Sequence, residues 1–367
     1  MKKIFFVALA AMIFAATGCK NESGNDGGQP ASIKITLASG YAKAGSRAQD
    51  AVTETVENQV NNFSVLVFSG GLLEKLESYT LSNQTTDFTQ TVNGLTTGLK
   101  RVVVVANVPT GHTILSYAAG TPYTTFAAAD IDLDTQEPAQ RPTNGLLMSG
   151  EITPTLAAGT NGPLTVPIHR AVARIELGTI NYAIEDVATW DVDLFEITSV
   201  MIQKAKSLSP VVAGDLQGLT KIPFYGGLAT GGSSPATITQ AEKTYLRETA
   251  NINDEGAENP HYFYVFPNNE NMVNVGTEGA PVNVEGSTLF VIEATYNGVQ
   301  TFFPVRINSN DADGFEKINR NTRYVLNITF KTLQGGGNPD VPLDPATLEV
   351  TIVPQGWQGP VTQNVEF

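Results

Sequence analysis

Short runs of alternating hydrophobic and polar residues recur along the chain and predict β-strands. Near the N-terminus, Ile33, Ile35 and Leu37 alternate with polar residues, which is typical of a strand with one buried face. The run FSVLVF at 63–68 is apolar on both faces and predicts a central strand. The VVVV run at 102–105 predicts another buried strand. The pattern indicates an all-β fold.

The second half of the chain continues this pattern. Ile168–Leu177 alternates and predicts one strand, with Arg170 and Arg174 on its polar face. These arginines either pair with carboxylates of a neighbouring strand or contact another subunit. We place a domain boundary just before this strand, near residue 165. Further strands are predicted over 194–202, 262–266, 287–296, 301–307 and 321–331.

The C-terminus carries two more alternating segments after a glycine break at 335–337. Leu348, Val350 and Ile352 repeat the period-two pattern of the first predicted strand. Beyond a turn around Trp357, a second segment places its apolar residues on one face. These are Val361, Val365 and Phe367. The two ends of the chain therefore predict equivalent amphipathic strands.

Composition agrees with many strands joined by turns. The 367 residues include 34 Gly and 20 Pro, and only 16% are charged. This composition excludes a helical bundle or a coiled coil. The formal net charge is −14, and no block of Lys and Arg is longer than two residues. Because phosphate contacts need clustered cations, nucleic acid is not an expected partner.

The first residues resemble an export signal. Lys2 and Lys3 precede the 13-residue apolar run Ile4–Ala16, which is too short to span a membrane. Small residues then precede Cys19, the one cysteine of the chain, as in a bacterial lipobox. We expect cleavage of the signal peptide 1–18 and lipidation of Cys19. A single cysteine also excludes an internal disulfide.

The sequence contains no catalytic motif. There is no Gly-x-Ser-x-Gly elbow and no phosphate-binding loop, and the three histidines are far apart. Asp130, Asp132 and Asp134 have the spacing that begins a calcium loop, but Thr135 and Arg141 stand where glycine and glutamate are needed. We expect outward-facing carboxylates there instead, and no catalytic residue, metal site or cofactor.

A proteolytic step would connect the two ends of the chain. The segment 38–50 is small and polar, and it holds one arginine, Arg47. An Arg-specific protease that cuts after Arg47 would separate the first strand from the rest of its domain. A strand from another molecule, with the same apolar pattern, could fill the vacated groove. Head-to-tail contacts that do not close into a ring produce a fibre.

Several stretches resemble the fimbrillins, the lipoprotein-derived subunits of type V pili in Bacteroidetes (FimA/Mfa-like families). They span almost the whole chain. They are the lipobox at Ala16–Cys19, the Arg47-Ala48 site ahead of Val60–Leu76, VVVVANVP at Val102–Pro109, HRAVARIEL at His169–Leu177, YFYVFPNN at Tyr262–Asn269, INRNTRYVLNITF at Ile318–Phe330 and VTIVPQGW at Val350–Trp357.

The resemblance implies two tandem transthyretin-like β-sandwich domains with short helices in the loops. By that likeness the chain divides into a signal peptide (1–18), a tether with a first strand that is removed on maturation (19–47), an N-terminal sandwich (48–165) and a C-terminal sandwich (166–367). The last would end in donor strands at 346–367. Cleavage would fall between Arg47 and Ala48. Ile33, Ile35 and Leu37 would be displaced, and the donor residues would be Leu348, Val350, Ile352, Trp357, Val361, Val365 and Phe367.

The resemblance also implies a function and its partners. The chain would be a pilus subunit, most similar to a stalk subunit because it has both a cleavage site and a donor tail. Its partners would be other copies, other pilus subunits, an extracellular Arg-specific protease and, through the lipid on Cys19, the outer membrane. It would pass from outer-membrane lipoprotein to surface fimbrium. Two alternatives stay open at this point: a monomeric surface glycan-binding lipoprotein, and a hydrolase built from dispersed carboxylates.

Overall fold

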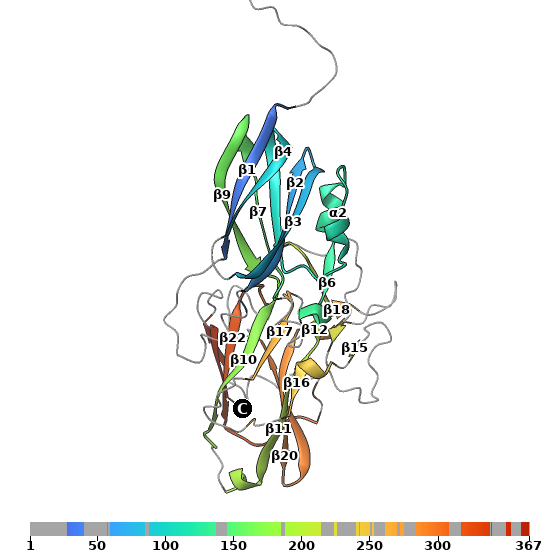
Figure 1. Ribbon diagram of the computed structural model, residues 1–367. Coiled ribbons are helices and arrows are strands. Elements are labelled where there is room, and N and C mark those ends of the chain that lie inside the picture. Colours follow the sequence, from blue (N-terminus) through green and yellow to red (C-terminus); the bar gives the residue numbers. More distant parts are fainter. Residues whose placement is uncertain are drawn as a thin grey trace, which may run out of the picture.

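The computed structural model consists of two lobes placed end to end (Figure 1). We call residues 28–170 the N-terminal lobe and residues 171–366 the C-terminal lobe. The residues that the structure describes are 28–39, 57, 59–84, 88–136, 145–184, 188–213, 224–225, 240–241, 243–249, 252, 261–269, 272–274, 283–285, 287–307, 317–337, 339, 350–353 and 361–366. Every structural statement below concerns these residues.

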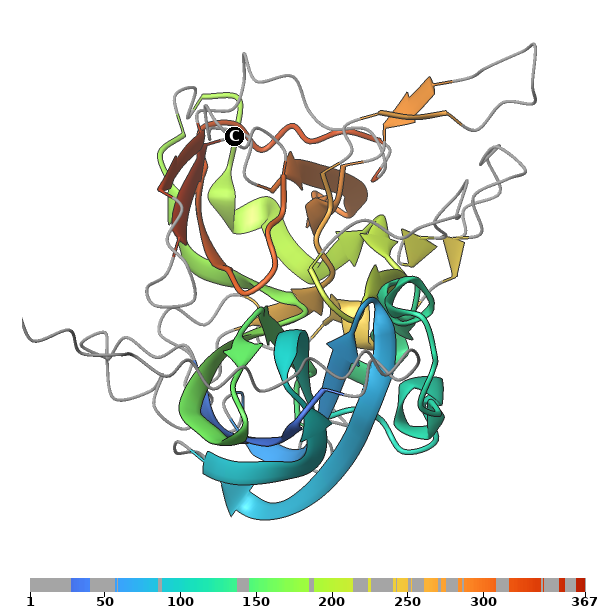
Figure 2. The same cartoon turned by 90° about the horizontal axis from the view of Figure 1, so that it is seen from above.

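The N-terminal lobe is built on one eight-stranded sheet. Its strands are β1 (Pro30–Ser39), β2 (Val60–Ser69), β3 (Leu72–Gln84), β4 (Phe88–Thr96), β5 (Gly98–Ala106), β7 (Met148–Ile152), β8 (Thr155–Leu156) and β9 (Gly159–Arg170). Their order is β3-β2-β5-β7-β9-β1-β4, with β8 paired to β5. Seen from above, these strands curve around a common interior (Figure 2).

The central strands β2 and β5 are buried on both faces, as the apolar runs predict. On the inner face, Val65 and Val104 belong to a core shared with β1, β4 and β9. The outer face is covered by the segment that contains η1 (Thr113–Ser116), α2 (Tyr123–Ala127), β6 (Asp130–Asp132) and η2 (Leu133–Gln136). Phe126 of α2 lies 5.7 Å from Phe68 between ring centroids. This second core continues into the C-terminal lobe.

The C-terminal lobe contains two larger sheets and the small sheets β12-β14-β15 and β18-β19, and its strand β13 pairs with β6 of the N-terminal lobe. One large sheet has the order β17-β10-β22-β24-β23 and the other β16-β11-β20-β21. The strands are β10 (Ala173–Tyr182), β11 (Phe195–Gln203), β16 (Arg247–Glu248), β17 (Tyr262–Val265), β20 (Leu289–Tyr296), β21 (Val299–Arg306), β22 (Arg323–Phe330), β23 (Val350–Val353) and β24 (Val361–Glu366). The shorter elements are η3 (Val192–Leu194), β12 (Ala205–Lys206), β13 (Leu208–Pro210), β14 (Phe224–Tyr225), β15 (Gln240–Ala241), η4 (Thr244–Leu246), β18 (Met272–Asn274) and β19 (Asn283–Glu285).

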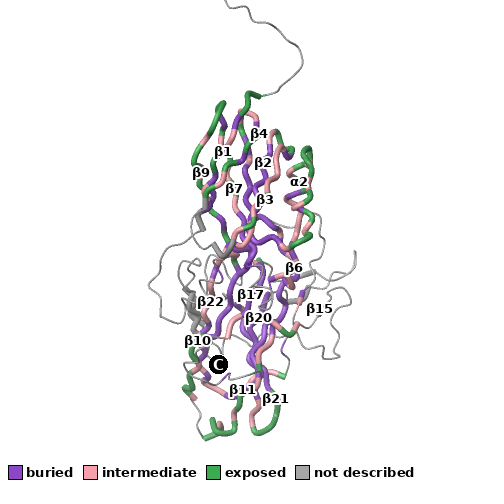
Figure 3. Tube along the Cα trace, viewed as in Figure 1, coloured by how far each residue is buried: buried purple, intermediate pink, exposed green. Residues whose placement is uncertain are grey.

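The two large sheets pack on a common core. Strands with an alternating pattern, such as β22, turn their apolar side chains toward this core. In β22, Tyr324, Leu326, Ile328 and Phe330 are fully buried, and the residues between them are half-buried. Phe330 contacts Phe303 of β21 at 5.0 Å between ring centroids. The expected all-β sandwich fold is confirmed, and Figure 3 shows the buried positions along the interior of both lobes.

The segment Ile168–Leu177 does not form the single strand that its alternation predicts. β9 ends at Arg170, and β10 begins at Ala173 in a different sheet. Ala171 and Val172 form the turn between them, and both are buried because this turn crosses the junction of the lobes. The predicted boundary near residue 165 falls within β9 and, as a division into folding domains, stays a prediction.

Candidate site for strand replacement

Strand β1 lies inside its sheet, with a hydrogen-bonded neighbour on each side. It pairs antiparallel with β4, from Pro30 opposite Thr96 to Leu37 opposite Phe88. On its other side it pairs parallel with β9. Among the described strands, β4 pairs with β1 alone. Removing β1 would therefore leave β4 without a ladder partner and open one edge of β9.

The side chains that the sequence identifies as the buried face of β1 are buried. Ile33, Ile35 and Leu37 are at most 4% exposed, whereas Lys34 between them is exposed. They pack in one core with Val92 of β4 and other side chains of β2, β5 and β9. Burying an aliphatic side chain of this size contributes about 1.5–3 kcal/mol. The apolar face of β1 thus contributes substantially to the stability of this core.

The direction of β1 is set by its partners. Ala31 lies opposite Gly159, where β9 begins at the free end of the N-terminal lobe. Ser39 lies opposite Ile168, two residues before β9 ends at the junction of the lobes. The strand therefore runs from the free end toward the junction. Any strand that replaced it with the same pairing would be antiparallel to β4 and parallel to β9.

The predicted processing residues lie outside the described residues. These processing residues are Cys19, Arg47 and Ala48. The chain is described again at Glu57, and its backbone oxygen accepts a hydrogen bond of 3.3 Å from Arg170 Nε. The described residues that flank Arg47 in the sequence, Ser39 at the end of β1 and Glu57, both lie at the junction of the lobes.

A buried ionic cluster surrounds Glu57. Its Oε1 accepts hydrogen bonds from Arg174 Nη1 at 3.0 Å and from the hydroxyl of Tyr264. Arg174 Nη2 lies 2.9 Å from Glu176 Oε2. The other carboxylate oxygen of Glu176, Oε1, lies 2.9 Å from Arg323 Nη2. Burial acts to lower the pKa of Arg174, but the charges of Glu57 and Glu176 raise it above its ordinary value. Arg174 is therefore a permanent cation.

Arg174 pairs with carboxylates, as one of the two alternatives predicts, but these belong to Glu57 ahead of β2 and to Glu176 of its own strand rather than to a neighbouring strand. Glu57 was not identified from the sequence, because nothing in the polar stretch around it distinguishes it from other glutamates. The valines 52, 56 and 60 predict a short helix there, and residue 57 is helical, but residues 51–56 and 58 lie outside the described part.

The C-terminal strands lie at the edge of a sheet. β24 pairs parallel with β22, from Val361 opposite Tyr324 to Glu366 opposite Thr329. β23 is the outermost strand and pairs antiparallel with β24, with Val350 opposite Val365. Four predicted donor residues, Val350, Ile352, Val361 and Val365, thus lie in strands. Leu348, Trp357 and Phe367 lie outside the described residues.

The edge position of β23 and β24 has a direct consequence for their release. Within the described chain, β23 and β24 are joined to the rest of the sheet only through the ladder between β24 and β22. Separating both strands breaks one strand–strand ladder. Releasing β1 breaks two, because it has a partner on each side.

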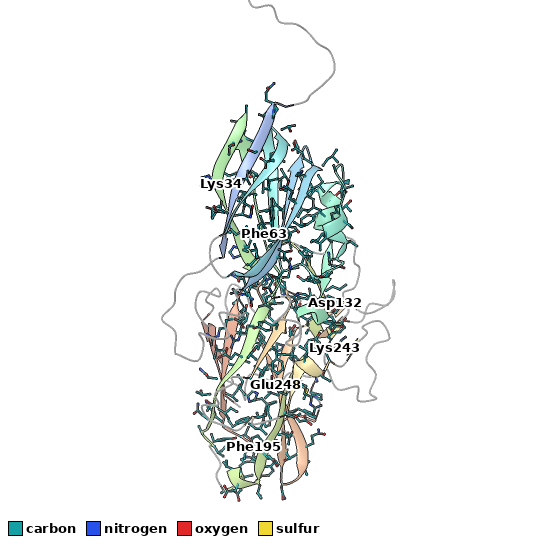
Figure 4. The ribbon with its side chains drawn as sticks, viewed as in Figure 1. Lys34, Phe63, Asp132, Phe195, Lys243 and Glu248 are labelled. Carbon is teal, nitrogen blue, oxygen red and sulfur yellow. The ribbon has the colours of Figure 1, made fainter. Side chains whose placement is uncertain are left out.

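Two of the three aspartates with calcium-like spacing, Asp132 and Asp134, accept hydrogen bonds from side chains of the C-terminal lobe. Asp134 accepts hydrogen bonds from Lys243 Nζ at 2.6 Å and Tyr245 at 2.8 Å. Asp132 accepts one from Tyr225 at 3.1 Å. Figure 4 labels Asp132 and Lys243 in the region where the two lobes meet. Within the described residues no group of three or more His, Cys, Asp or Glu side chains is arranged to hold a metal ion.

None of the described helices is both long enough and apolar enough to cross a membrane.

Known proteins support the fimbrillin resemblance. Residues 31–182 match the family model described as Major fimbrial subunit protein (FimA). This segment contains β1, most of the eight-stranded sheet and the turn into the C-terminal lobe. That family is one of structural fimbrial subunits, not of enzymes. No curated protein sequence matches the chain.

Solved structures share the fold over most of the chain. A candidate cell adhesion protein from Bacteroides eggerthii is 20% identical, with a TM-score of 0.64, over 93% of this chain and 99% of that one. The fimbrilin FimA from Porphyromonas gingivalis is 15% identical, with a TM-score of 0.60, over 92% and 97%. The tip fimbrial protein Mfa3 from the same organism, with a C-terminal truncation, is 18% identical, with a TM-score of 0.51, over 81% and 93%.

At these identities the likeness to the solved structures establishes the fold alone. The evidence for a family relationship is the match of residues 31–182 to the FimA family model. Together they confirm the resemblance to the fimbrillins: residues 31–182 match the FimA family model, and most of the chain shares the fold of these solved structures.

Proposed function

We propose that this protein is a stalk subunit of a cell-surface pilus that polymerises by strand replacement. It is exported as a lipoprotein attached through Cys19 to the outer membrane, cut after Arg47 by an extracellular Arg-specific protease, and built into a fibre that supports adhesion. In the fibre, residues 346–367 of one copy occupy the place of β1 in another. Other copies and other pilus subunits are its partners.

The observation that carries this proposal is the position of β1 between β4 and β9. β1 precedes Arg47 in the chain, so a cut there leaves the strand held by non-covalent contacts alone. When it leaves, the side chains of one core face and two rows of backbone N–H and C=O groups lose their partners. An incoming strand with the same apolar alternation restores both.

The location of the C-terminal strands supports their role as donors. They lie at a sheet edge, where release breaks a single ladder. A strand of ten residues like β1 spans about 33 Å, and the 22 residues from 346 to 367 are long enough to replace it. The chain has both a cleavable arginine and a donor tail, which is why we assign it to the stalk.

Cleavage and assembly can be tested on residues 20–367. The chain is digested with an Arg-specific protease and analysed on unheated SDS gels. We expect a cut at Arg47 followed by an SDS-resistant ladder. The matched control is Arg47→Lys, which keeps the charge but removes the protease site, and it is expected to stay monomeric. A second variant that ends at Pro345 is expected to be cut but to form no ladder.

Two results would contradict the proposal. A ladder formed by the uncut Arg47→Lys chain would show that cleavage is not required. A ladder formed by the chain that ends at Pro345 would show that the tail is not the donor.

A further inference from the structure

The free end of the C-terminal lobe exposes large apolar side chains. Tyr182, Val192, Leu194 and Val299 are 40%, 38%, 45% and 70% exposed, and we call these four residues the terminal patch. They come from the end of β10, from η3 and from the start of β21, next to the turn that joins it to β20. Asn297 N donates a 2.9 Å hydrogen bond to Leu194 O, which holds this turn against η3.

The terminal patch lies beside the end of β22, after which the chain continues toward its C-terminal strands. Tyr182 stacks on Phe330, the last residue of β22, at 5.5 Å between ring centroids. Beyond β22, Gly336 pairs with Phe302 in β21, close to the same end. Any tail that reaches out to another copy from here starts beside the terminal patch, so the two copies come close at this surface.

The free end of the N-terminal lobe, opposite the terminal patch, has a surface that the terminal patch of another copy can approach. The terminal patch is flanked by three exposed acids, Asp191, Asp193 and Glu196. At the free end of the N-terminal lobe, residues 93–99 and 152–162 contain no charged residue. The neighbouring charges of Glu74 and Lys100 are paired with each other at 2.6 Å. At this end Leu99 is 68% exposed.

Electrostatic repulsion between copies determines which surfaces can pack against each other. In a chain of net charge −14, copies repel each other at most surfaces. An end with uncharged loops, a paired Glu74 and Lys100 and an exposed leucine lets an acidic, apolar end approach at little electrostatic cost. This end also contains the entrance to the groove of β1, because Pro30 at the start of β1 lies opposite Thr96.

We propose that the terminal patch of one copy packs on the Leu99 end of the next copy, as a second contact beside the exchanged strand. This inference rests on the proposed strand replacement. A flexible tail alone fixes neither the distance nor the angle between successive subunits. A packed contact between the two ends fixes both and makes each junction of the fibre rigid.

The test compares two doubly substituted chains, each carrying two added negative charges. The first carries Leu194→Asp and Val299→Asp in the terminal patch. The matched control carries Thr80→Asp and Thr113→Asp, at exposed positions on the sides of the N-terminal lobe. Both are cut, and fibre growth is followed by light scattering and electron microscopy. We expect the patch variant to grow at least tenfold more slowly, with irregular angles between subunits, and the control to match the parent.

Two further measurements separate this contact from strand replacement itself. A labelled peptide of residues 346–367 is added to the cut chains, and we expect it to bind the patch variant and the parent equally, because the groove is intact. Leu99→Lys added to the patch variant is expected to restore growth through new charge pairs. Failure of the peptide to bind the cut parent would refute strand replacement. Parent-like growth and fibre geometry in the patch variant would refute the second contact.

Discussion

Arg174 Nη1 donates a 3.0 Å hydrogen bond to Glu57 Oε1, and both side chains are almost fully buried. Glu57 lies just ahead of β2 in the N-terminal lobe, and Arg174 belongs to β10 in the C-terminal lobe. The pair therefore ties the segment that follows the predicted cleavage site to the other lobe. A cut after Arg47 would free β1 while Glu57 keeps the new N-terminal segment attached at the junction.

Removing the carboxylate of Glu57 is expected to destabilise the protein strongly. Glu57→Ala leaves Arg174 buried with less compensation, and losing one partner of a buried ion pair costs about 3–5 kcal/mol. The free energy of unfolding, measured by denaturant titration, checks this. Arg174→Met in the same background is expected to recover part of the loss, because no unpaired charge remains. A loss below about 1 kcal/mol for Glu57→Ala would contradict the importance of the pair.

Truncating two neighbouring residues of β1 is expected to change the stability by very different amounts. Ile35→Ala removes a side chain that is 1% exposed, which typically costs about 2–5 kcal/mol. Lys34→Ala changes an exposed side chain and is expected to alter stability by less than about 0.5 kcal/mol. After cleavage, Ile35→Ala is also expected to speed polymerisation, because β1 dissociates more readily. Equal polymerisation rates for the two cut variants would indicate that release of β1 does not limit assembly.

The tyrosine at the lobe junction gives a pH signature. Burial, the hydrogen bond to Asp132 and the charges of Asp132 and Asp134 raise the pKa of Tyr225 from 10.0 to about 12. The folded-state pKa is the higher one, so this stabilising contribution is complete below pH 10 and is lost as the pH rises toward 12. Absorbance of the phenolate is expected to show one late ionisation that Tyr225→Phe removes. In Asp132→Asn the same ionisation is expected to move toward pH 10, and an unchanged position would rule out Asp132 as a cause.

Calcium is expected to leave the protein unchanged. Two of the three carboxylates with calcium-like spacing are already hydrogen-bonded, Asp134 to Lys243 and Tyr245 and Asp132 to Tyr225. Because Lys243 supplies a positive charge where a cation would bind, the thermal midpoint is expected to be the same in millimolar calcium and in EDTA. An increase with calcium that Asp134→Asn abolishes would contradict this.

Much of the fold follows from local patterns, and the exceptions have physical reasons. β1, β2 and β22 are evident from alternation or continuous apolar runs, because each packs at least one face in a core. The break at Ala171 could not be predicted, since both sides of the turn are buried at the lobe junction and the apolar pattern continues through it. Glu57 was missed for a related reason: its partner Arg174 is far away in sequence, and pairing across lobes leaves no local signal.

The central claim is that β1 leaves when the fibre forms, and mass spectrometry of the fibre tests it most directly. Residues 20–367 are cut, the monomer and the assembled fibre are purified separately, and the fragment 20–47 is quantified in each. The account predicts about one fragment per subunit in the cut monomer and a nearly complete loss of it from the fibre. Fibres that retain one fragment per subunit would contradict strand replacement, because β1 would still occupy its place between β4 and β9.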